Sequence, residues 1–214
     1  MTRTDRSEPL TAGRRRDDRA PFSRAERGAL GVVVVALVGF GVYGRLTGAP
    51  STVAYLGTVA AVGAVVGRCR RAPLPVPLAV ALAGLALAHL AGGLVGVGHD
   101  VLYNASLGGP AFRYDHPVHA AGVFLGTLAI WVLLVAPAVG SAQRRTGIAM
   151  SVLGGLGLGA LNETIEFLTT VAHAGAHVGG YANTGWDLVC NVIGAVAAGV
   201  VLDLRPRQFE PTVS

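Results

Sequence analysis

The sequence predicts an all-α membrane protein, a polytopic helical bundle of about six transmembrane helices with both termini in the cytoplasm. Two observations support this fold class. Of the 214 residues, 52% are hydrophobic and only 14% are charged, whereas roughly 25% of the residues in soluble domains are charged. The apolar residues form runs that are apolar on all faces and long enough to cross a bilayer, which takes roughly 20 residues. A soluble core is therefore a poor alternative.

We expect three regions along the chain. Residues 1–27 form a disordered, arginine-rich cytoplasmic tail, residues 28–205 the membrane domain, and residues 206–214 a short second cytoplasmic tail. The arginines and aspartates at 14–19, followed by Pro21, are typical of a solvated tail. Arginines beside a membrane also contact anionic headgroups, so membrane lipids are the expected partners.

Six apolar segments are the expected spans. They cover approximately residues 29–46, 51–67, 78–97, 117–139, 147–171 and 186–204. The first span is short and rich in glycine and valine, which leaves a signal peptide as the alternative. The long tail before it, and Pro50 directly after the small residue Ala49, favour an uncleaved anchor instead. The third span follows a helix-breaking segment with three prolines, residues 73–77.

The later spans have recognisable starts. Pro117 suits the first turn of the fourth span. The fifth span follows the basic residues 144–145. Thr184 and Asp187 match a capping box at the start of the sixth span, and Trp186 suits the membrane interface.

The distribution of arginine predicts the orientation. All 17 basic residues are arginine, and all but Arg45 and Arg113 fall on one side of a six-span topology. Because cytoplasmic segments are enriched in basic residues, we expect both termini in the cytoplasm and the protein in the cell (plasma) membrane. The net charge of +5 does not indicate nucleic-acid binding, because the arginines form no stripe and no recognition motif accompanies them.

Polar side chains interrupt four of the predicted spans near their outer ends. An ionisable group at membrane depth is costly and usually faces a cavity or a partner, so it marks a candidate functional site. With a helix rise of 1.5 Å per residue, these side chains lie in one layer close to the outer surface. The set is His89, Asp115, His119, Asn162, Glu163, Glu166, Asp187 and Asn191.

The spacing within this set indicates shared helix faces. Three pairs have the three- or four-residue spacing that places both side chains on one face. Two carboxylates close together in apolar surroundings cannot both stay ionised, so one keeps a proton or a cation joins them. Imidazole beside carboxylates would suit zinc, iron or manganese. The pairs are Glu163 with Glu166, Asp115 with His119, and Asp187 with Asn191.

We therefore expect one polar pocket that opens to the outer leaflet. Glu163 and Glu166 are its candidate catalytic residues. The candidate ligands of a divalent metal, the one cofactor that these residues suggest, are Asp115, His119 and Asp187. The supporting polar residues are His89, Asn162 and Asn191.

Structural roles are the alternative for several of these residues. Asp115 and Asp187 lie where helix caps are expected. Asn191 could bridge two helices by hydrogen bonding, and His89 could be a hydrogen-bonded core histidine. Each of these four residues therefore keeps two interpretations.

The support for a functional role differs between two pairs of residues. Glu163 and Glu166 resist a structural explanation, because the sequence places no arginine at their depth. His173 and His177 lie four residues apart in a glycine-rich outer loop. They would bind a metal together only if that loop were helical, so we favour a solvated loop.

Three motifs carry a resemblance to a known family. They are Tyr114-Asp115-His116-x-x-His119, Asn162-Glu163-x-x-Glu166-Phe167 and, the most specific, Asn183-Thr184-Gly185-Trp186-Asp187-Leu188-x-x-Asn191-x-x-Gly194-Ala195. Over about residues 100–200 the sequence resembles the YjdF-type inner-membrane proteins of bacteria and archaea, a family of unknown function. It departs from their pattern at His116 and Phe167, where the family more often has arginine and tryptophan. The same pattern is distantly similar to VanZ-like membrane proteins, which are linked to glycopeptide tolerance and envelope properties.

Three functions remain open on the sequence alone. The first is a membrane-embedded enzyme, metal-dependent in one version, that acts on a lipid or lipid-linked envelope substrate. The second is a transporter or channel for protons, cations or small solutes, although the inner halves of the spans lack a matching polar path. The third is a non-catalytic envelope or interaction protein. The sequence gives no indication of the oligomeric state.

Overall fold

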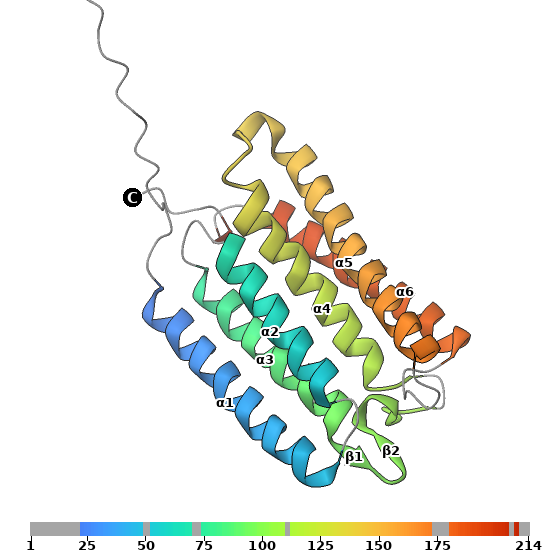
Figure 1. Cartoon of the computed structure of the whole chain (residues 1–214). Coiled ribbons are helices and arrows are strands. Elements are labelled where there is room, and N and C mark those ends of the chain that lie inside the picture. The colour runs from blue at the N-terminus through green and yellow to red at the C-terminus, as the bar shows by residue number, and fades with distance from the viewer. Residues whose placement is uncertain are drawn as a thin grey trace, which may run out of the picture.

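The computed structural model describes residues 22–48, 52–69, 74–109, 112–172, 180–205 and 208–209. Within these ranges, six helices form one bundle, and a small hairpin lies at one end of it (Figure 1). The helices are α1 Arg24–Thr47, α2 Thr52–Cys69, α3 Val76–Leu94, α4 Asp115–Ile130, α5 Arg144–Ala172 and α6 Tyr181–Leu204. The short elements are β1 Gly96–Val97, β2 Asp100–Val101, the 3-10 helices η1 Leu102–Asn104 and η3 Ser141–Gln143, and the π-helical turn η2 Trp131–Val135.

Five of the helices are long and apolar enough to cross a membrane. They are α1, α3, α4 extended by its π-helical turn, α5 up to Val171, and α6, with mean hydropathies between 1.3 and 2.2. The remaining helix, α2, holds a shorter apolar segment, Tyr55–Gly67. The predicted all-α membrane bundle is therefore confirmed, with α2 as its shortest apolar helix.

Helix α1 begins earlier than the predicted first span because a capping box starts it. The Ser23 hydroxyl accepts a hydrogen bond from the Glu26 backbone N–H (3.2 Å), and the Glu26 carboxylate accepts one from the Ser23 N–H (2.7 Å). The helix thus includes residues 24–27, which the sequence placed in the tail.

Helices α3 and α6 also differ from the predicted spans. α3 ends at Leu94, and the next residues pair in a hairpin, Gly96 with Val101 and Val97 with Asp100. α6 begins at Tyr181 after Gly180, so Thr184 and Asp187 lie inside the helix. The expected capping box at Thr184–Asp187 is therefore wrong.

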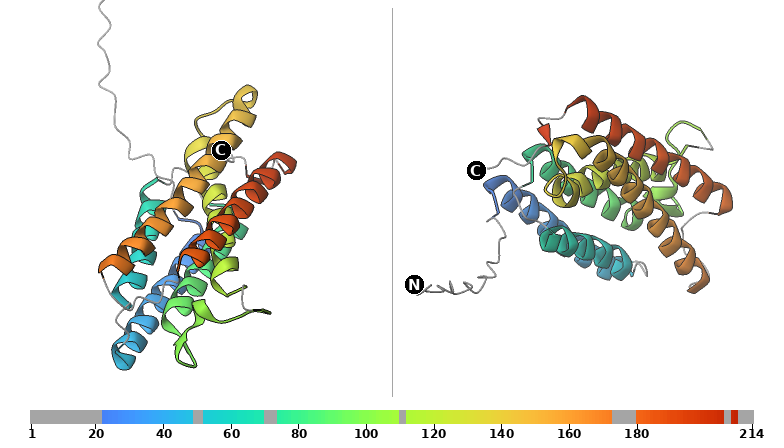
Figure 2. Two further views of the ribbon diagram at one scale, coloured as in Figure 1. Left: turned by 90° about the vertical axis from the view of Figure 1, so that its right-hand side faces the viewer. Right: turned by 90° about the horizontal axis from the view of Figure 1, so that it is seen from above.

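Helix α4 lies in the middle of the bundle, between α3 and the pair α5 and α6 (Figures 1 and 2). Gly194 of α6 faces the Ala120 backbone of α4, and a Cβ at Gly194 would overlap the Ala120 carbonyl oxygen. A Cβ at Gly159 of α5 would lie only 2.8 Å from the Asn191 side chain of α6. These two glycines allow the close helix approach that is typical of small residues in membrane bundles.

The apolar core has two parts that share α3. One part joins α3 to α4, α5 and α6 and includes the buried Trp131 and Leu202. The other joins α3 to α1 and α2 and includes the buried Val59 and Leu90. α3 therefore connects the first two helices to the last three.

Contacts at one end of the bundle join distant parts of the chain. The Leu74 backbone N–H donates a hydrogen bond to the Glu26 carboxylate (2.9 Å), which ties α1 to the start of α3. The Trp131 indole donates to the Phe209 carbonyl oxygen (3.2 Å), and the Arg144 guanidinium lies 5.5 Å from the centre of the Trp131 ring. The start of α1 and the ends of α4 and α6 therefore lie together.

The described arginines are distributed unequally between the two ends of the bundle. Among the arginines whose side chains the structure describes, Arg45 and Arg113 lie at the end that carries the hairpin. The others lie at the opposite end: Arg24, Arg27, Arg144, Arg145 and Arg205. This arrangement agrees with the six-span topology, and the assignment of the arginine-rich end to the cytoplasm stays a prediction.

Candidate metal centre

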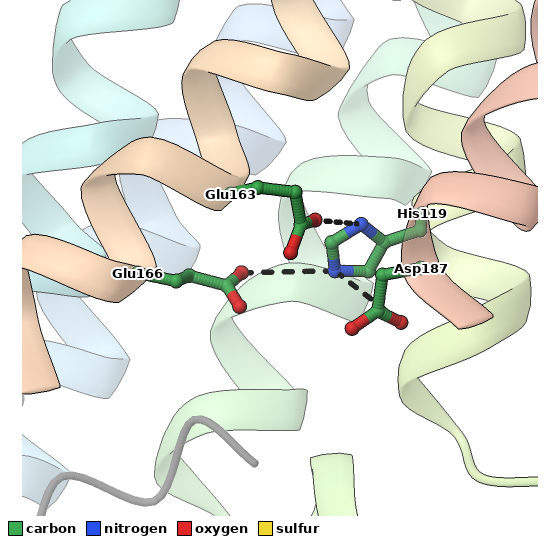
Figure 3. Close-up of side chains that lie close together, drawn as sticks. All are labelled: His119, Glu163, Glu166 and Asp187. Carbon is green, nitrogen blue, oxygen red and sulfur yellow. Dashed lines mark ion pairs between the residues drawn. The ribbon is translucent and has the colours of Figure 1, made fainter. Parts of the chain in front are cut away.

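His119 is the centre of a buried polar cluster formed by α4, α5 and α6 (Figure 3). Its Nδ1 lies 3.1 Å from Glu163 Oε1. Its Nε2 lies 3.6 Å from Glu166 Oε1 and 4.0 Å from Asp187 Oδ1. Within α4, the same Nε2 lies 3.2 Å from Asp115 Oδ1. Four carboxylates therefore surround one imidazole.

The local structure of each helix explains why these side chains meet. Glu163 and Glu166 lie three residues apart in α5, so they share the face that α5 turns toward α4. Asp187 is fully buried (0% exposed), because Gly194, two turns further along α6, brings that helix against α4. His119 faces both helices from the second turn of α4.

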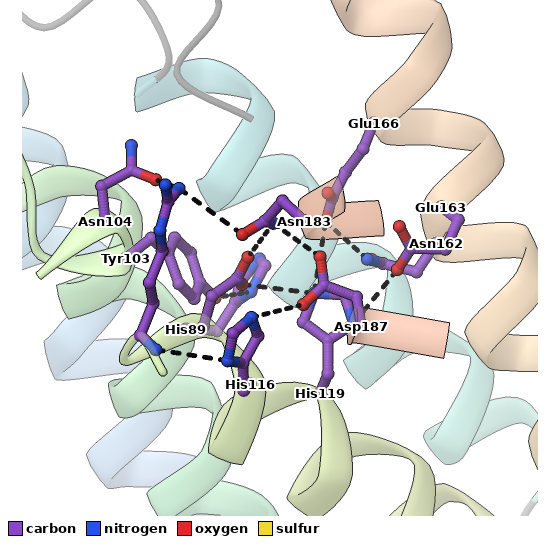
Figure 4. A network of polar contacts seen from close by, with 12 residues as sticks. His89, Tyr103, Asn104, His116, His119, Asn162, Glu163, Glu166, Asn183 and Asp187 are labelled. Atoms are coloured by element: carbon purple, nitrogen blue, oxygen red, sulfur yellow. Dashed lines mark hydrogen bonds and ion pairs between the residues drawn. The ribbon is translucent and has the colours of Figure 1, made fainter. Parts of the chain in front are cut away.

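Two asparagines hold the carboxylates in place (Figure 4). Asn183 Nδ2 donates to Asp115 Oδ2 (2.9 Å) and to Asp187 Oδ2 (2.6 Å), which links α4 to α6. Asn162 Nδ2 donates to Glu166 Oε1 (2.7 Å). Residues that fix carboxylates by hydrogen bonding are typical of the surroundings of metal sites.

His116 adds a second imidazole at the edge of the cluster. Its Nδ1 accepts a hydrogen bond from the Arg113 backbone N–H (3.2 Å), so the neutral ring carries its proton on Nε2, which lies 3.9 Å from Asp187 Oδ1. The Arg113 guanidinium donates to Asn104 Oδ1 (3.0 Å) and to Asn183 Oδ1 (3.5 Å). The loop before α4 therefore positions Asn183, which in turn holds the carboxylates.

Several buried polar atoms of the cluster have no hydrogen-bond partner among the described residues. They include both carboxylate oxygens of Glu163, Oδ1 of Asp187 and both polar side-chain atoms of Asn191. The 3.1 Å approach of Glu163 to His119 is thus a close contact without hydrogen-bond geometry. A buried carboxylate oxygen without a donor is destabilising, so these oxygens favour a cation as their partner.

The charges and distances of the cluster suit one metal ion. Its four carboxylates outnumber its two imidazoles, and such an excess requires bound protons or a cation. One donor atom each from His119, Glu163, Glu166 and Asp187 lies within 4.8 Å of the others. Donors bound to one tetrahedral metal at roughly 2.0–2.2 Å lie roughly 3.3–3.6 Å apart, so the most distant donors must approach each other by roughly 1 Å to complete the site.

The structure brings the predicted ligands and the predicted catalytic residues into this one cluster. The helix-cap alternative is wrong for Asp115 as well as for Asp187: Asp115 is the first residue of α4 and the cap position is Tyr114. The supporting residue Asn162 holds Glu166, and Asn191 packs on Gly159. The other histidine pair, at 173 and 177, lies outside the described residues.

A cavity of about 1500 Å³ lies beside the cluster, and Asp115, His119 and Glu166 line part of it. His89 stands apart from the cluster but lines this cavity as well. The Tyr103 hydroxyl lies 2.6 Å from His89 Nδ1, and the Tyr55 ring lies 5.0 Å from the His89 ring. Burial raises the pKa of the Tyr103 phenol, so the phenol stays protonated beside His89. His89 is therefore hydrogen-bonded through one nitrogen, as the structural alternative predicts, and also lies on the cavity wall.

Besides His116, which was named only within a motif, sequence reasoning missed three residues at this site. Asn183 was placed before the sixth span, although its four-residue spacing from Asp187 becomes informative once both lie in α6. Tyr55 and Tyr103 gave no signal, because isolated tyrosines near span ends are typical of the membrane interface. Their contact with His89 depends on the tertiary packing.

Replacing Asn183 with alanine is expected to weaken Mn²⁺ binding by about 10–100-fold, because supporting residues of metal sites have effects of this size. The measurement is calorimetric titration of the purified full chain in detergent. Thr184→Ala, at the next position of α6, is the control and should leave the affinity unchanged. Equal affinities for both variants would show that Asn183 does not support a metal.

Comparison with known proteins supports the membrane assignment. A family model described as "Predicted membrane protein (DUF2238)" matches residues 25–208. This match confirms the prediction of an uncharacterised membrane-protein family and is consistent with the YjdF-type resemblance; it does not test the VanZ-like similarity. No curated protein and no solved structure matches the chain significantly.

Proposed function

This chain belongs to the DUF2238 family of predicted membrane proteins, and from that premise we propose that it is a metal-dependent membrane enzyme. The family description states no activity, so the proposal comes from the polar cluster. The enzyme would bind one divalent metal ion near the outer surface of the plasma membrane. Its substrate would be a lipid or a lipid-linked molecule of the cell envelope.

The observation that carries this proposal is the set of buried carboxylate oxygens around His119 that lack donors among the described residues. Isolated buried carboxylates are strongly unfavourable, and a metal ion is the partner that satisfies several at once. One imidazole with carboxylates suits zinc, iron or manganese.

We assign the roles from position. His119, Glu163 and Asp187 are the proposed ligands, because they are buried and their donor atoms lie together. One ring nitrogen of His119 binds the metal, and the other donates to a nearby carboxylate, which fixes the ring. Asp115 can accept that bond, since it lies 3.2 Å from Nε2 and is held by Asn183. Asp115 is thus a positioning residue instead of the expected ligand, and Glu163 is a ligand instead of the expected catalytic residue.

Glu166 is the proposed general base. It lines the cavity, its side chain is 25% exposed, and Asn162 holds one of its oxygens. A bound metal supplies Lewis-acid activation of water and of a substrate oxygen. In a hydrolysis, the water oxygen bonds to the electrophilic carbon or phosphorus while Glu166 takes one water proton. The bond to the leaving group then breaks, and Glu166 returns that proton to the leaving group.

Glu166→Gln is expected to keep the metal and to lower turnover by at least about 100-fold, the lower range of general acid–base catalysis. The test uses the full chain in nanodiscs with Mn²⁺ or Zn²⁺ and an envelope lipid extract, and mass spectrometry identifies the products. Asn162→Asp, which removes the amide that donates to Glu166 Oε1, should lower turnover by a smaller factor. Wild-type protein that binds no metal, or a Glu166→Gln variant with undiminished turnover, would overturn the proposal.

A further inference from the structure

We propose that the groove between α2 and α5 binds a hydrocarbon chain of a phosphate-bearing membrane lipid, with the headgroup at the metal centre. This inference rests on the proposed function, because the metal centre decides which end of the groove takes the headgroup. It names the substrate class of that same site.

The groove is one cavity of about 1500 Å³, and side chains from all six helices line it. Its lining includes Val59 and Val62 of α2 and Leu158 and Ile165 of α5, and α1, α3 and α4 contribute further lining residues. Figure 1 shows α2 and α5 on either side of α4. Sites for small molecules usually measure roughly 300–1,000 Å³, so this cavity suits a larger ligand.

The groove is longer than one leaflet of a bilayer. Its lining on α2 extends from Val53 to Gly67, which at 1.5 Å per residue is roughly 21 Å. Half of a hydrocarbon core of roughly 30 Å is about 15 Å. A lipid chain whose headgroup lies at the outer surface would therefore lie in the groove along its whole length.

Glycines keep the groove open. A Cβ at Gly63 or Gly67 of α2, or at Gly122 of α4, would meet nothing within 4 Å, although all three positions line the cavity. Small residues in membrane helices usually allow helices to touch, as Gly194 does. These three glycines face open space instead, so the bundle maintains a hollow there.

The two ends of the groove differ in chemistry in the way that an amphiphile requires. Asp115, His119 and Glu166 line one end, beside the buried Tyr103. Val62 and Val66, two and three turns further along α2 than Tyr55, line the part away from that end. Water does not fill apolar hollows, and the bilayer interior offers hydrocarbon in its place. The apolar part of the groove therefore takes a lipid chain.

The polar end favours a phosphate-bearing headgroup. Without a cation, the four carboxylates would repel an anionic headgroup. With a divalent cation bound, the same place attracts phosphate oxygens, which are common ligands of hard and borderline metals. A bound metal would thus make the cluster a binding site for the headgroup of a phosphate-bearing lipid.

The test is photocrosslinking in nanodiscs of phosphatidylglycerol and phosphatidylethanolamine. The probe is a phosphatidylglycerol with a diazirine midway along one chain, and peptide mass spectrometry maps the crosslinks on the full chain. We expect crosslinks on the groove faces of α2 and α5. Gly63→Leu, which fills the hollow, should remove them, and Gly122→Leu is the second variant with the same expected loss.

Gly157→Leu is the matched control, because it is also a helical glycine with open space but does not line the groove. It should keep the groove crosslinks, and every variant should keep those on Val196 and Val200, on the exposed face of α6. Groove crosslinks that persist in both filled variants overturn the inference.

Metal content measured on the same samples separates the two proposals. Groove crosslinks without bound metal support a chain site in the groove but contradict both the enzyme and the placement of the phosphate headgroup at the cluster. Metal without groove crosslinks contradicts the lipid site and leaves the metal centre standing.

Discussion

Replacing His119 with alanine is expected to abolish stoichiometric metal binding. Among the residues that the structure describes, His119 is the one side chain that contacts carboxylates from all three helices of the cluster. Its loss therefore removes a ligand and the contact that gathers the others. The loss of affinity should exceed the roughly 10–100-fold effect of supporting residues. Metal content of the purified full chain, measured by mass spectrometry after dialysis against Mn²⁺, gives the result.

His99→Ala is the matched control for this experiment. His99 lies at the same end of the bundle, in the exposed turn between β1 and β2, and is not part of the cluster. It should leave the metal content unchanged. Glu163→Gln, which keeps the side-chain shape, provides a second ligand variant in case His119→Ala does not fold. Equal metal content in wild type, His119→Ala and Glu163→Gln would exclude the proposed site.

Replacing Gly194 with alanine is expected to destabilise the bundle by about 1–3 kcal/mol, the usual effect of overpacking. The added Cβ would overlap the Ala120 carbonyl oxygen, which is backbone and cannot rotate away. α6 must then move from α4, and Asp187 moves from His119 with it. Thermal unfolding in detergent measures the stability, and the metal content of the same sample should fall.

Gly185→Ala is the control on the same helix. A Cβ at Gly185 meets nothing within 4 Å, and alanine in a helix interior is favoured over glycine by roughly 0.5–1 kcal/mol. This variant should be at least as stable as wild type. If Gly194→Ala behaves like Gly185→Ala, the close contact of α4 with α6 does not position the cluster.

The fold class was predictable because it depends on composition and on the length of apolar segments, which do not require knowledge of tertiary contacts. Apolar runs and the low share of charged residues indicate a membrane bundle whatever the packing. The helix ends were less predictable. The capping box at Ser23 and Glu26 lies within a segment whose arginines are typical of a tail. Gly180, and not Thr184, precedes α6.

The members of the cluster were predictable, but their contacts were not. Three- and four-residue spacing placed Glu163 with Glu166 and Asp115 with His119 on common faces. The approach of α6 depends on Gly194 meeting the Ala120 backbone, and a glycine in a sequence does not show which helix it touches. For the same reason Asn183, which joins two of the carboxylates, was missed.

Anomalous scattering from crystals of the full chain grown with Mn²⁺ tests the central claim most directly. We predict one manganese peak in the cluster, roughly 2.0–2.3 Å from a ring nitrogen of His119 and from carboxylate oxygens of Glu163 and Asp187. Data from a Glu163→Gln crystal should show a weaker peak or none. A wild-type cluster without manganese, closed by direct hydrogen bonds between His119 and its carboxylates, would contradict the account.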